Sequence, residues 1–124
     1  MLKKQYRLKF SGRIQEIRLT GQSWRNRWLA LSVLANKQPQ SRFAFSVSRR
    51  VGNAVTRNRI KRLMREAVRQ YLPYVGGGWD VLLIARSRTR GATFEQMERA
   101  VADLLRASRL WTGSTASMPT ADSA

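Results

Sequence analysis

The pattern of apolar and polar positions predicts a long helix in the middle of the chain. It follows a strand-like segment at 42–48 and a turn at 51–53, and Pro73 ends it near Leu72. The expected apolar stripe consists of Ile60, Leu63, Met64, Ala67, Val68 and Tyr71. A second, mostly basic stripe consists of Asn58, Lys61, Arg62, Arg65 and Arg69, with Arg57 at its border. One side of this helix is therefore expected to pack on a core while the other presents cations.

Apolar runs also predict three strands. Residues 23–34 and 43–48 contain alternating patterns, and residues 80–85 form a short continuous run that suits a central strand. We expect the first two strands to form a hairpin through a polar turn at 35–40. Its core-facing residues would be Leu29, Leu31, Val33, Phe43, Phe45 and Val47. The opposite face is small and polar, which fits either plain solvent exposure or a floor for an extended nucleic-acid strand.

Two further helices are predicted by their capping residues. Ser11 is a suitable N-cap for a helix over residues 12–19, and Gly21 follows its end. Thr93 and Gln96 form a capping-box pattern that starts the last helix.

The charge of the chain indicates which kinds of partner it binds. Lys and Arg number 24 against 7 acids, so the net charge is +17, a balance that attracts polyanions. Nucleic acid is the first candidate partner and an anionic membrane surface the second. A solvated basic helix face normally interleaves acids, and this helix has almost none, which favours phosphate binding. Arg86, Arg88 and Arg90 follow the third strand in an alternating row and favour phosphate contact as well.

Length and composition indicate one folded domain. The chain has 124 residues, of which 43% are hydrophobic. We expect residues 1–111 to form a single RNA-binding domain that begins with a basic arm over residues 1–9, and residues 112–124 to form a disordered tail. The sequence begins without the apolar run of a signal peptide and contains no membrane-length apolar stretch. A cytoplasmic location is the default expectation.

No catalytic residue and no metal site are expected in this chain. It contains neither cysteine nor histidine, which excludes thiolate and imidazole chemistry. A metal-dependent nuclease needs converging carboxylates, and the seven acids are scattered along the sequence. If the protein belongs to an enzyme, the chemistry is expected to lie on a partner.

The run over residues 45–63, with Arg57-Asn58-Arg59 inside it, closely resembles the signature of the bacterial ribonuclease P protein subunit. The resemblance extends over most of the chain, up to residue 108. It implies an α/β (α+β) two-layer sandwich, a small mixed sheet with an N-terminal helix and a C-terminal helix. It also implies that the long basic helix lies in a left-handed βαβ crossover, against the usual preference.

The same resemblance implies a function. Members of this family pair with a catalytic RNA, which removes the 5′ leader of precursor tRNA with Mg²⁺ that is held mainly by the RNA. This chain would then be the accessory protein of an endoribonuclease, in a heterodimeric protein–RNA complex that also binds precursor tRNA.

Candidate binding residues follow from the matched positions. The set expected to contact the catalytic RNA is Arg57, Asn58, Arg59, Lys61, Arg62 and Arg65. The leader-binding set combines matched positions with polar positions of the small strand face, and consists of Ile14, Arg18, Ser32, Ser46, Ser48, Arg49, Arg50 and Arg86.

The sequence departs from the family pattern where the leader is expected to stack. Family members often have aromatic residues at the positions of Ile14, Arg18 and Ser32. Stacking on an aromatic side chain contributes roughly 1–3 kcal/mol per base. We therefore expect weaker stacking and more reliance on phosphate contacts, unless Trp24 or Trp28 substitutes.

Three other classes of function fit parts of the pattern. A structural RNA-binding protein, such as a small ribosomal protein, fits the charge and size but not the long signature. A DNA-binding module lacks the short second helix of a helix-turn-helix. A protein-only nuclease lacks the necessary ligands.

Overall fold

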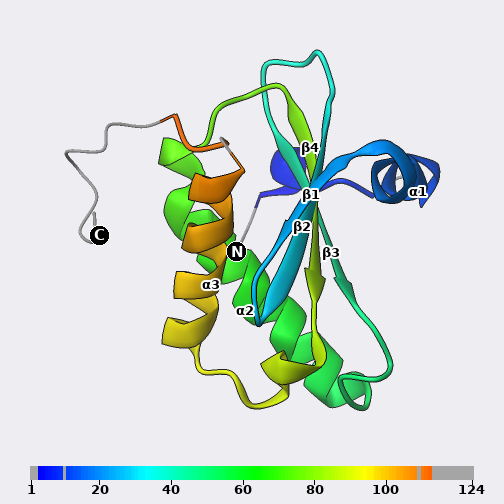
Figure 1. Ribbon diagram of the computed structural model, residues 1–124, viewed down its shortest axis with the longest axis vertical. Helices are drawn as coiled ribbons and strands as arrows, with labels where there is room; N and C mark the ends of the chain where they lie inside the picture. Colours follow the sequence, from blue (N-terminus) through cyan, green and yellow to red (C-terminus); the bar gives the residue numbers. More distant parts are fainter. Residues whose placement is uncertain (1–2, 10, 109, 113–124) are drawn as a thin grey trace.

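The chain folds into a mixed β-sheet that has α-helices packed on both of its faces (Figure 1). The structure is a computed structural model and describes residues 3–9, 11–108 and 110–112. The α-helices are α1 (Ser11–Thr20), α2 (Ala54–Tyr71) and α3 (Phe94–Ala107). The strands are β1 (Gln22–Arg25), β2 (Leu29–Ala35), β3 (Arg42–Val47) and β4 (Trp79–Ala85). Short 3₁₀ helices are η1 (Lys4–Tyr6), η2 (Leu72–Tyr74) and η3 (Ser87–Gly91).

The strand order is β1-β2-β4-β3, which places β4 between the two segments expected to pair. β4 runs antiparallel to β2 and parallel to β3, with Leu83 opposite both Leu31 and Phe45. The predicted hairpin of residues 23–34 with 43–48 is therefore wrong. β4 is apolar towards both faces of the sheet, so a central position buries more apolar surface than an edge would.

The segment predicted as one strand over residues 23–34 is two strands joined by a turn at Asn26. The side-chain oxygen of Asn26 accepts hydrogen bonds from the backbone N–H groups of Trp28 and Leu29, both at 2.9 Å. Such a local bond competes with the strand ladder and turns the chain. The result is an antiparallel β1–β2 hairpin.

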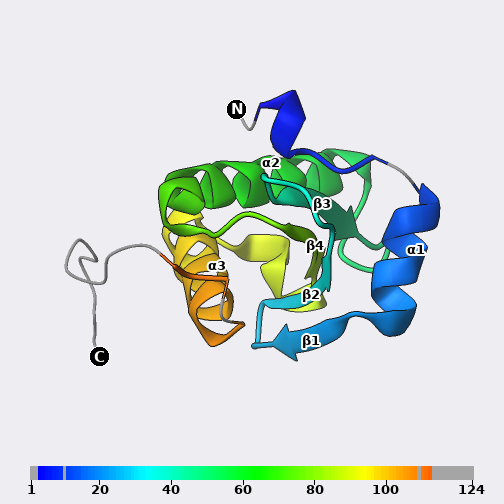
Figure 2. The same ribbon diagram turned by 90° about the horizontal axis from the view of Figure 1, so that it is seen from above.

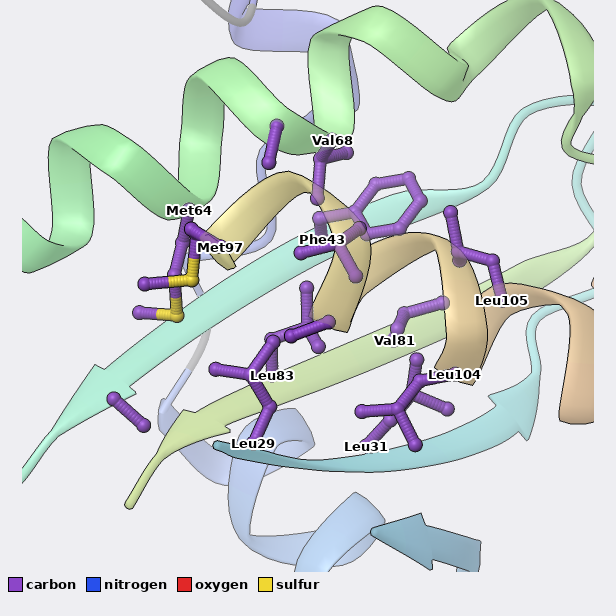
Figure 3. Close-up of a cluster of buried hydrophobic side chains, with 14 of the residues drawn as sticks. Leu29, Leu31, Phe43, Met64, Val68, Val81, Leu83, Met97, Leu104 and Leu105 are labelled. Atoms are coloured by element: carbon purple, nitrogen blue, oxygen red, sulfur yellow. The ribbon is translucent and has the colours of Figure 1, made fainter. Parts of the chain in front are cut away.

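The main core lies between the sheet and the pair α2 and α3 (Figure 3). Five of the six expected core-facing strand residues are buried in it, and Phe45 packs against it half-buried. On α2, the buried residues are Ile60, Met64, Ala67 and Val68, with Leu63 and Tyr71 partly buried against the same cluster. The stripe predicted from the helical period is thus confirmed.

The opposite face of the sheet is covered by α1, as the view from above shows (Figure 2). A smaller cluster there contains Leu8, Ile17, Ala44 and Leu82. The small face predicted as either solvent-exposed or an open floor is therefore largely covered by a helix, and the α+β class with a small mixed sheet is confirmed.

The connection from β3 through α2 to β4 joins two neighbouring parallel strands. Figures 1 and 2 together show that this crossover is left-handed, as the resemblance implied. Asn53 caps α2 by accepting a hydrogen bond from the N–H of Thr56, and Pro73 lies in η2 directly after its end. The Thr93–Gln96 capping box of α3 is present as predicted.

Part of the basic arm is docked on the outer edge of β3. Arg7 forms a parallel bridge with Phe43, and the N–H of Leu8 donates to the carbonyl of Phe43 at 2.7 Å. Of the predicted tail, the structure describes only Thr112, whose N–H donates to the carbonyl of Tyr74; residues 113–124 lie outside the described residues. Within the described part of the chain, no helix is both long and apolar enough to cross a membrane.

Candidate nucleic-acid interface

A pocket rich in arginine lies at the end of the sheet where β3 and β4 finish. Its volume is ≈ 390 Å³. The residues that line it, called the arginine pocket here, are Arg27, Ser48, Arg50, Ala85, Arg86, Ser87 and Arg88. They come from the β1–β2 turn, the β3–α2 turn and the segment after β4, which meet at the lower end of Figure 1. Because β3 and β4 are parallel, their carboxyl ends and the loops that follow them meet at one edge.

The β3–α2 turn is held in place by Arg90. Its Nε donates to the carbonyl of Val51 at 2.7 Å, and its Nη2 donates to the carbonyl of Arg50 at 3.4 Å. The hydroxyl of Ser48 also accepts from the N–H of Arg50 at 3.3 Å. These bonds fix the backbone that carries Arg50, while its guanidinium has no partner within the described part of the chain and lines the pocket.

The β1–β2 turn is held from the other side by Arg86. Its Nη1 donates to the carbonyl of Asn26 at 2.6 Å, and its backbone N–H donates to the carbonyl of Trp28. Arg27 lies between these two contacts on the turn. The row of Arg86, Arg88 and Arg90 does not continue as an extended strand, because η3 begins at Ser87 and turns Arg90 towards the β3–α2 turn.

Among the residues that the structure describes, no carboxylate lines the arginine pocket. Arg13, Arg42 and Arg69 are paired with carboxylates, and all three lie outside the pocket. Four guanidinium groups thus share one pocket without a neutralising acid, and an anion there would relieve their mutual repulsion.

A second basic surface follows α2. Arg57, Lys61 and Arg65, spaced four residues apart and called the α2 cation row here, are half-buried on one side of the helix. The guanidinium of Arg65 lies over the ring of Phe45 at 5.9 Å, a cation–π distance. The Nε atoms of Arg57 and Arg65 are buried without a hydrogen-bond partner. Groups left in this state are unusual in folded proteins and suit a surface that is completed by a ligand.

The remaining predicted α2 residues differ from one another. Asn58 and Arg62 are exposed. Arg59 is turned towards the segment before α3, where its Nη2 donates to the carbonyl of Ala92 at 2.7 Å. The structure therefore gives Arg59 an intramolecular contact that the sequence did not predict.

The predicted leader residues fall into separate groups. Ser48, Arg50 and Arg86 line the arginine pocket. Arg18 of α1 donates to the hydroxyl of Ser46 on β3 at 3.2 Å, and Ile14 of α1 packs against the smaller core cluster on the same face of the sheet. This region, with Ile14, Arg18 and Ser46, is called the α1–β3 junction here.

Two predicted leader residues lie outside both groups. Ser32 is only 6% exposed, and its hydroxyl shares a 2.8 Å hydrogen bond with that of Ser23. Arg49 is exposed on the β3–α2 turn but does not line the pocket. Trp24 and Trp28 pack against the core on the α2 and α3 side of the sheet, so they do not replace the missing aromatics at the α1–β3 junction.

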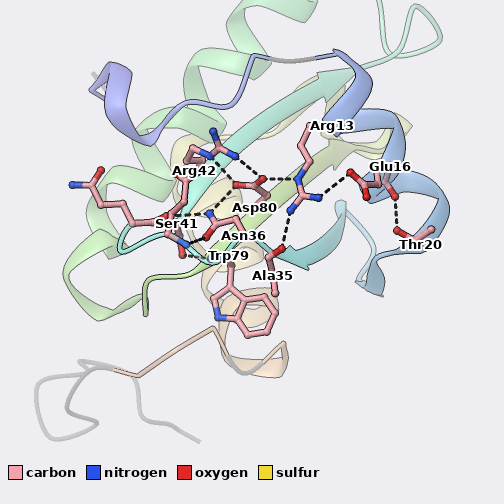
Figure 4. Close-up of polar contacts among 11 residues, drawn as sticks. Arg13, Glu16, Thr20, Ala35, Asn36, Ser41, Arg42, Trp79 and Asp80 are labelled. Carbon is pink, nitrogen blue, oxygen red and sulfur yellow. Dashed lines mark hydrogen bonds and ion pairs between the residues drawn. The ribbon is translucent and has the colours of Figure 1, made fainter.

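A buried carboxylate ties α1 to the far end of the sheet (Figure 4). Asp80 is fully buried and accepts hydrogen bonds from Arg13 at 2.7 Å, from Arg42 at 2.8 and 2.9 Å, and from Asn36 at 2.9 Å. Burial alone would raise the pKa of Asp80, but the hydrogen bonds from Arg42, Asn36 and Arg13 outweigh it and hold the pKa below its ordinary value. Hydrogen bonds to Asp80 and Glu16 raise the pKa of Arg13. Asp80 had been interpreted only as the start of an apolar run.

Comparison with known proteins identifies the family. The sequence profile of the family described as Ribonuclease P matches residues 2–109. The chain belongs to the bacterial ribonuclease P protein family. The ribonuclease P protein component of Roseiflexus castenholzii is 37% identical over 98% of this chain and 100% of its own length. That of Clostridioides difficile is 38% identical over 69% of this chain and 76% of its own.

Solved structures agree with this assignment. The ribonuclease P protein of Staphylococcus aureus has a TM-score of 0.79 at 31% identity, covering 86% of this chain and 97% of its own. That of Thermotoga maritima has a TM-score of 0.76 at 26% identity, covering 82% and 96%. This chain is thus the protein component of the ribonuclease P holoenzyme, and the holoenzyme is an endoribonuclease. The role of the chain in processing the 5′ leader of precursor tRNA follows from the family. Membership implies the RNA subunit as its partner.

Sequence analysis did not predict Arg27 as a binding residue of this ribonuclease P protein, whereas Arg88 and Arg90 belong to the row already expected to contact phosphate. Arg27 and Arg88 line the pocket, and Arg90 holds a turn beside it. Arg27 lies in the segment predicted as one continuous strand, and that pattern gives no sign of the turn that places it in the pocket. Among the described residues, no group of three or more His, Cys, Asp or Glu side chains is placed to hold a metal ion.

Proposed function

We propose that this ribonuclease P protein holds the single-stranded 5′ leader of precursor tRNA in the arginine pocket and at the α1–β3 junction, and contacts the catalytic RNA through α2. The observation that carries the proposal is the arginine pocket, in which guanidinium and hydroxyl donors gather without a carboxylate. Charge-assisted hydrogen bonds from arginine suit phosphate oxygens, and they do not depend on base identity.

The leader contacts divide by chemistry. Ser48, Arg50 and Arg86 offer donors to phosphate, and Arg49 extends the basic surface on the same turn. At the α1–β3 junction, Arg18 offers a flat guanidinium on which a base stacks, and Ile14 offers an apolar side chain. Ser32 is buried and contributes indirectly, by positioning the hydroxyl of Ser23 through their shared hydrogen bond.

The contact with the catalytic RNA uses a second surface, which lies on α2. The α2 cation row supplies Arg57, Lys61 and Arg65, and Arg62 and Asn58 are exposed beside it. Arg59 contributes with the part of its guanidinium that Ala92 leaves free. Two RNA-facing surfaces on one protein allow it to bring two polyanions together and to reduce the repulsion between them.

In this proposal the Mg²⁺ of the reaction is held mainly by the RNA, and the chain acts in a cytoplasmic complex of one protein with one RNA. The chain's own residues bind and orient RNA and take no part in bond cleavage. Neutralising phosphate charge has most effect when few cations are available, so assistance should be largest at low Mg²⁺.

The test is cleavage of a 5′-labelled precursor tRNA at low Mg²⁺ by the protein alone, by the catalytic RNA alone and by both. Cleavage that is efficient only with both supports the proposal. Cleavage by the protein alone would require an active site in this chain. If adding the protein gave the RNA no advantage, a purely structural RNA-binding role would replace the proposal.

A further inference from the structure

Helix α1 carries two residues of the α1–β3 junction, but apolar packing holds this helix only weakly on the sheet. Among the described residues of α1, only Ile17 is fully buried. Ile14 packs half-buried against the same small cluster, and Leu19 is 73% exposed. A surface helix normally buries a continuous apolar stripe of about three to four residues every two turns. Because α1 lacks such a stripe, its position on the sheet depends on other contacts.

An ionic contact holds the N-terminal half of α1 (Figure 4). Each nitrogen atom of the Arg13 guanidinium has a different partner. Nε donates to the carboxylate of Asp80 at 2.7 Å, Nη1 donates to Glu16 at 2.9 Å, and Nη2 donates to the carbonyl of Ala35 at 2.8 Å. The orientation of this planar group is therefore fixed on all sides, which the single ammonium of a lysine cannot reproduce.

Asp80 is itself held in place, because both of its carboxylate oxygens have partners on the sheet side of the contact. Oδ1 accepts from Asn36 and from Nε of Arg42, both at 2.9 Å, and Oδ2 accepts from Nη2 of Arg42 at 2.8 Å. Asp80 lies on β4 and is 0% exposed, and Arg42 begins β3. The Arg13–Asp80 contact thus ties α1 directly to the two strands that form the middle and the edge of the sheet.

The other end of α1 is held by its backbone. Gly21 follows the helix, and a Cβ atom at this position would lie 2.6 Å from the carbonyl oxygen of Val33, so the chain lies directly against β2. Along the helix axis, Ile14 is roughly 10 Å from Gly21 and Arg18 roughly 4.5 Å. If the contact of Arg13 is lost, movement of α1 about its Gly21 end therefore displaces Ile14 further than Arg18.

We propose that Arg13 and Asp80 are positioning residues for precursor tRNA, because their ionic contact sets the distance between α1 and β3 and thus the width of the α1–β3 junction. Neither residue is a ligand of the RNA. Asp80 is fully buried, and every nitrogen of the Arg13 guanidinium already has a partner within the protein. This inference rests on the proposed leader-binding function. It goes beyond it by assigning part of the affinity to two residues that do not touch the leader.

Charge and position predict opposite effects for one matched pair of variants. D80N and E16Q each remove one negative charge from a partner of Arg13. If only charge mattered, both variants would raise the affinity for a polyanionic leader by a similar small factor. We expect D80N to lower this affinity instead, because Arg13 loses the carboxylate that anchors it to the sheet. E16Q changes a side chain that is 54% exposed and keeps the Arg13–Asp80 contact, so it should not lower the affinity.

Because D80N also weakens the fold, a second comparison uses R13Q, which leaves Asp80 with Arg42 and Asn36. The control R99Q removes one exposed charge from α3. Each full-length variant is assembled with the catalytic RNA, and its affinity is measured for precursor tRNAs with a long leader and with a one-nucleotide leader.

We expect R13Q to lose about fivefold in affinity for the long leader alone, a change of about 1 kcal/mol, because part of the stacking of one base is lost. R99Q should lose the same small factor on both substrates. R13K keeps the charge but not the planar fork, so it should lose nearly as much as R13Q.

Two further measurements separate positioning from a loss of folded protein. For the long-leader substrate, R13Q should raise KM and leave kcat unchanged, whereas a fraction of unfolded protein would lower kcat for both substrates. In the background I14A/R18Q, which lacks both leader side chains of α1, adding R13Q should have little further effect. Effects that simply added would show that Arg13 does not act through these two residues.

The inference and the proposed function fail on different results. If R13Q matched R99Q on both substrates, or if a folded D80N raised the affinity as E16Q does, the ionic contact would not position α1, although leader binding itself would stand. If the wild type showed no advantage for the long leader, the proposed function and the inference would both fail. Thermal unfolding under the conditions of the affinity measurement shows whether each variant is folded, and R13Q decides the question if D80N is not.

Discussion

At the scale of single residues, Arg59 combines two tasks that its neighbours on α2 keep apart. Its Nη2 reaches the carbonyl of Ala92, directly before the N-cap of α3, at 2.7 Å. It therefore ties the beginning of α2 to the beginning of α3. Asn58 is exposed and has no such contact in the described residues. A change at position 59 thus mixes an effect on folding with any effect on RNA binding.

We predict that Arg59→Ala lowers the free energy of unfolding by about 1 kcal/mol, because it removes a charge-assisted hydrogen bond at a partly exposed site. Asn58→Ala should leave stability unchanged, and both variants should weaken assembly with the catalytic RNA. Urea denaturation of the two variants beside the wild type measures the difference. Equal stability of the two variants would show that the contact with Ala92 contributes nothing.

At the scale of secondary-structure elements, α1 depends on polar contacts for its attachment. Ile17 is its only fully buried side chain among the described residues of the helix. Arg13 joins it to Asp80 on β4 and also donates to Glu16 and to the carbonyl of Ala35 (Figure 4). Since Ile14 and Arg18 lie on the same helix, the position of these two leader residues depends on Asp80, which touches neither.

We predict that Asp80→Asn destabilises the fold at neutral pH by about 3 kcal/mol, because Arg13 and Arg42 lose the carboxylate that compensates their partial burial. The folded state lowers the pKa of Asp80, so its contribution is fully present above the unfolded value near 3.9. It is lost as pH falls through the lower folded value.

The stability difference between the wild type and Asp80→Asn should therefore shrink as pH falls below about 4. Denaturation curves between neutral and acidic pH measure it. Asp103→Asn, at an exposed position of α3, is the control and should follow the wild type at every pH. A difference that stayed constant into acid would mean that the charge of Asp80 is not what stabilises the fold.

The secondary structure could be predicted largely from local patterns, whereas the pairing of strands could not. The buried side of α2 follows from its helical period and its end from Pro73, and both are properties of nearby residues. The strand is interrupted at Asn26 because the side-chain oxygen of this residue accepts hydrogen bonds from the backbone N–H groups of Trp28 and Leu29. The place of β4 depends on competition among distant segments, which no local pattern reveals.

At the scale of the whole molecule, the binding surfaces depend on how segments meet. The resemblance supplied the α2 residues because they are contiguous in the sequence. The arginine pocket needs the β1–β2 turn, the β3–α2 turn and η3 together. Arg27 therefore carried no signal of its own, and the row of Arg86, Arg88 and Arg90 did not reveal which of its members share a pocket. Ser32 looked open in a predicted hairpin, but α1 and the hydroxyl of Ser23 cover that face.

The net charge of +17 makes binding by this protein strongly dependent on salt. For a single strand, each phosphate contact contributes about 0.7 to the slope of log affinity against log salt concentration. We predict that R27Q/R88Q, which removes two charges of the arginine pocket, lowers this slope for leader binding by about 1.4. The control K37Q/R99Q, which removes two exposed charges outside the pocket, should change it by much less. Titrations at several salt concentrations measure it, and equal slopes for the two variants would contradict direct phosphate contact.

The central position of β4 determines when, during synthesis of the chain, the RNA-binding surfaces can form. β4 is the last strand of the sheet to leave the ribosome, after β1, β2, β3 and α2 have been synthesised. Its insertion between β2 and β3 pairs it with both strands through long-range contacts, which form slowly. The same event brings Asp80 to Arg13 and carries Arg86 to the β1–β2 turn. The nascent chain therefore acquires its RNA-binding surfaces in one late step, and a chain arrested before β4 has cations but no site.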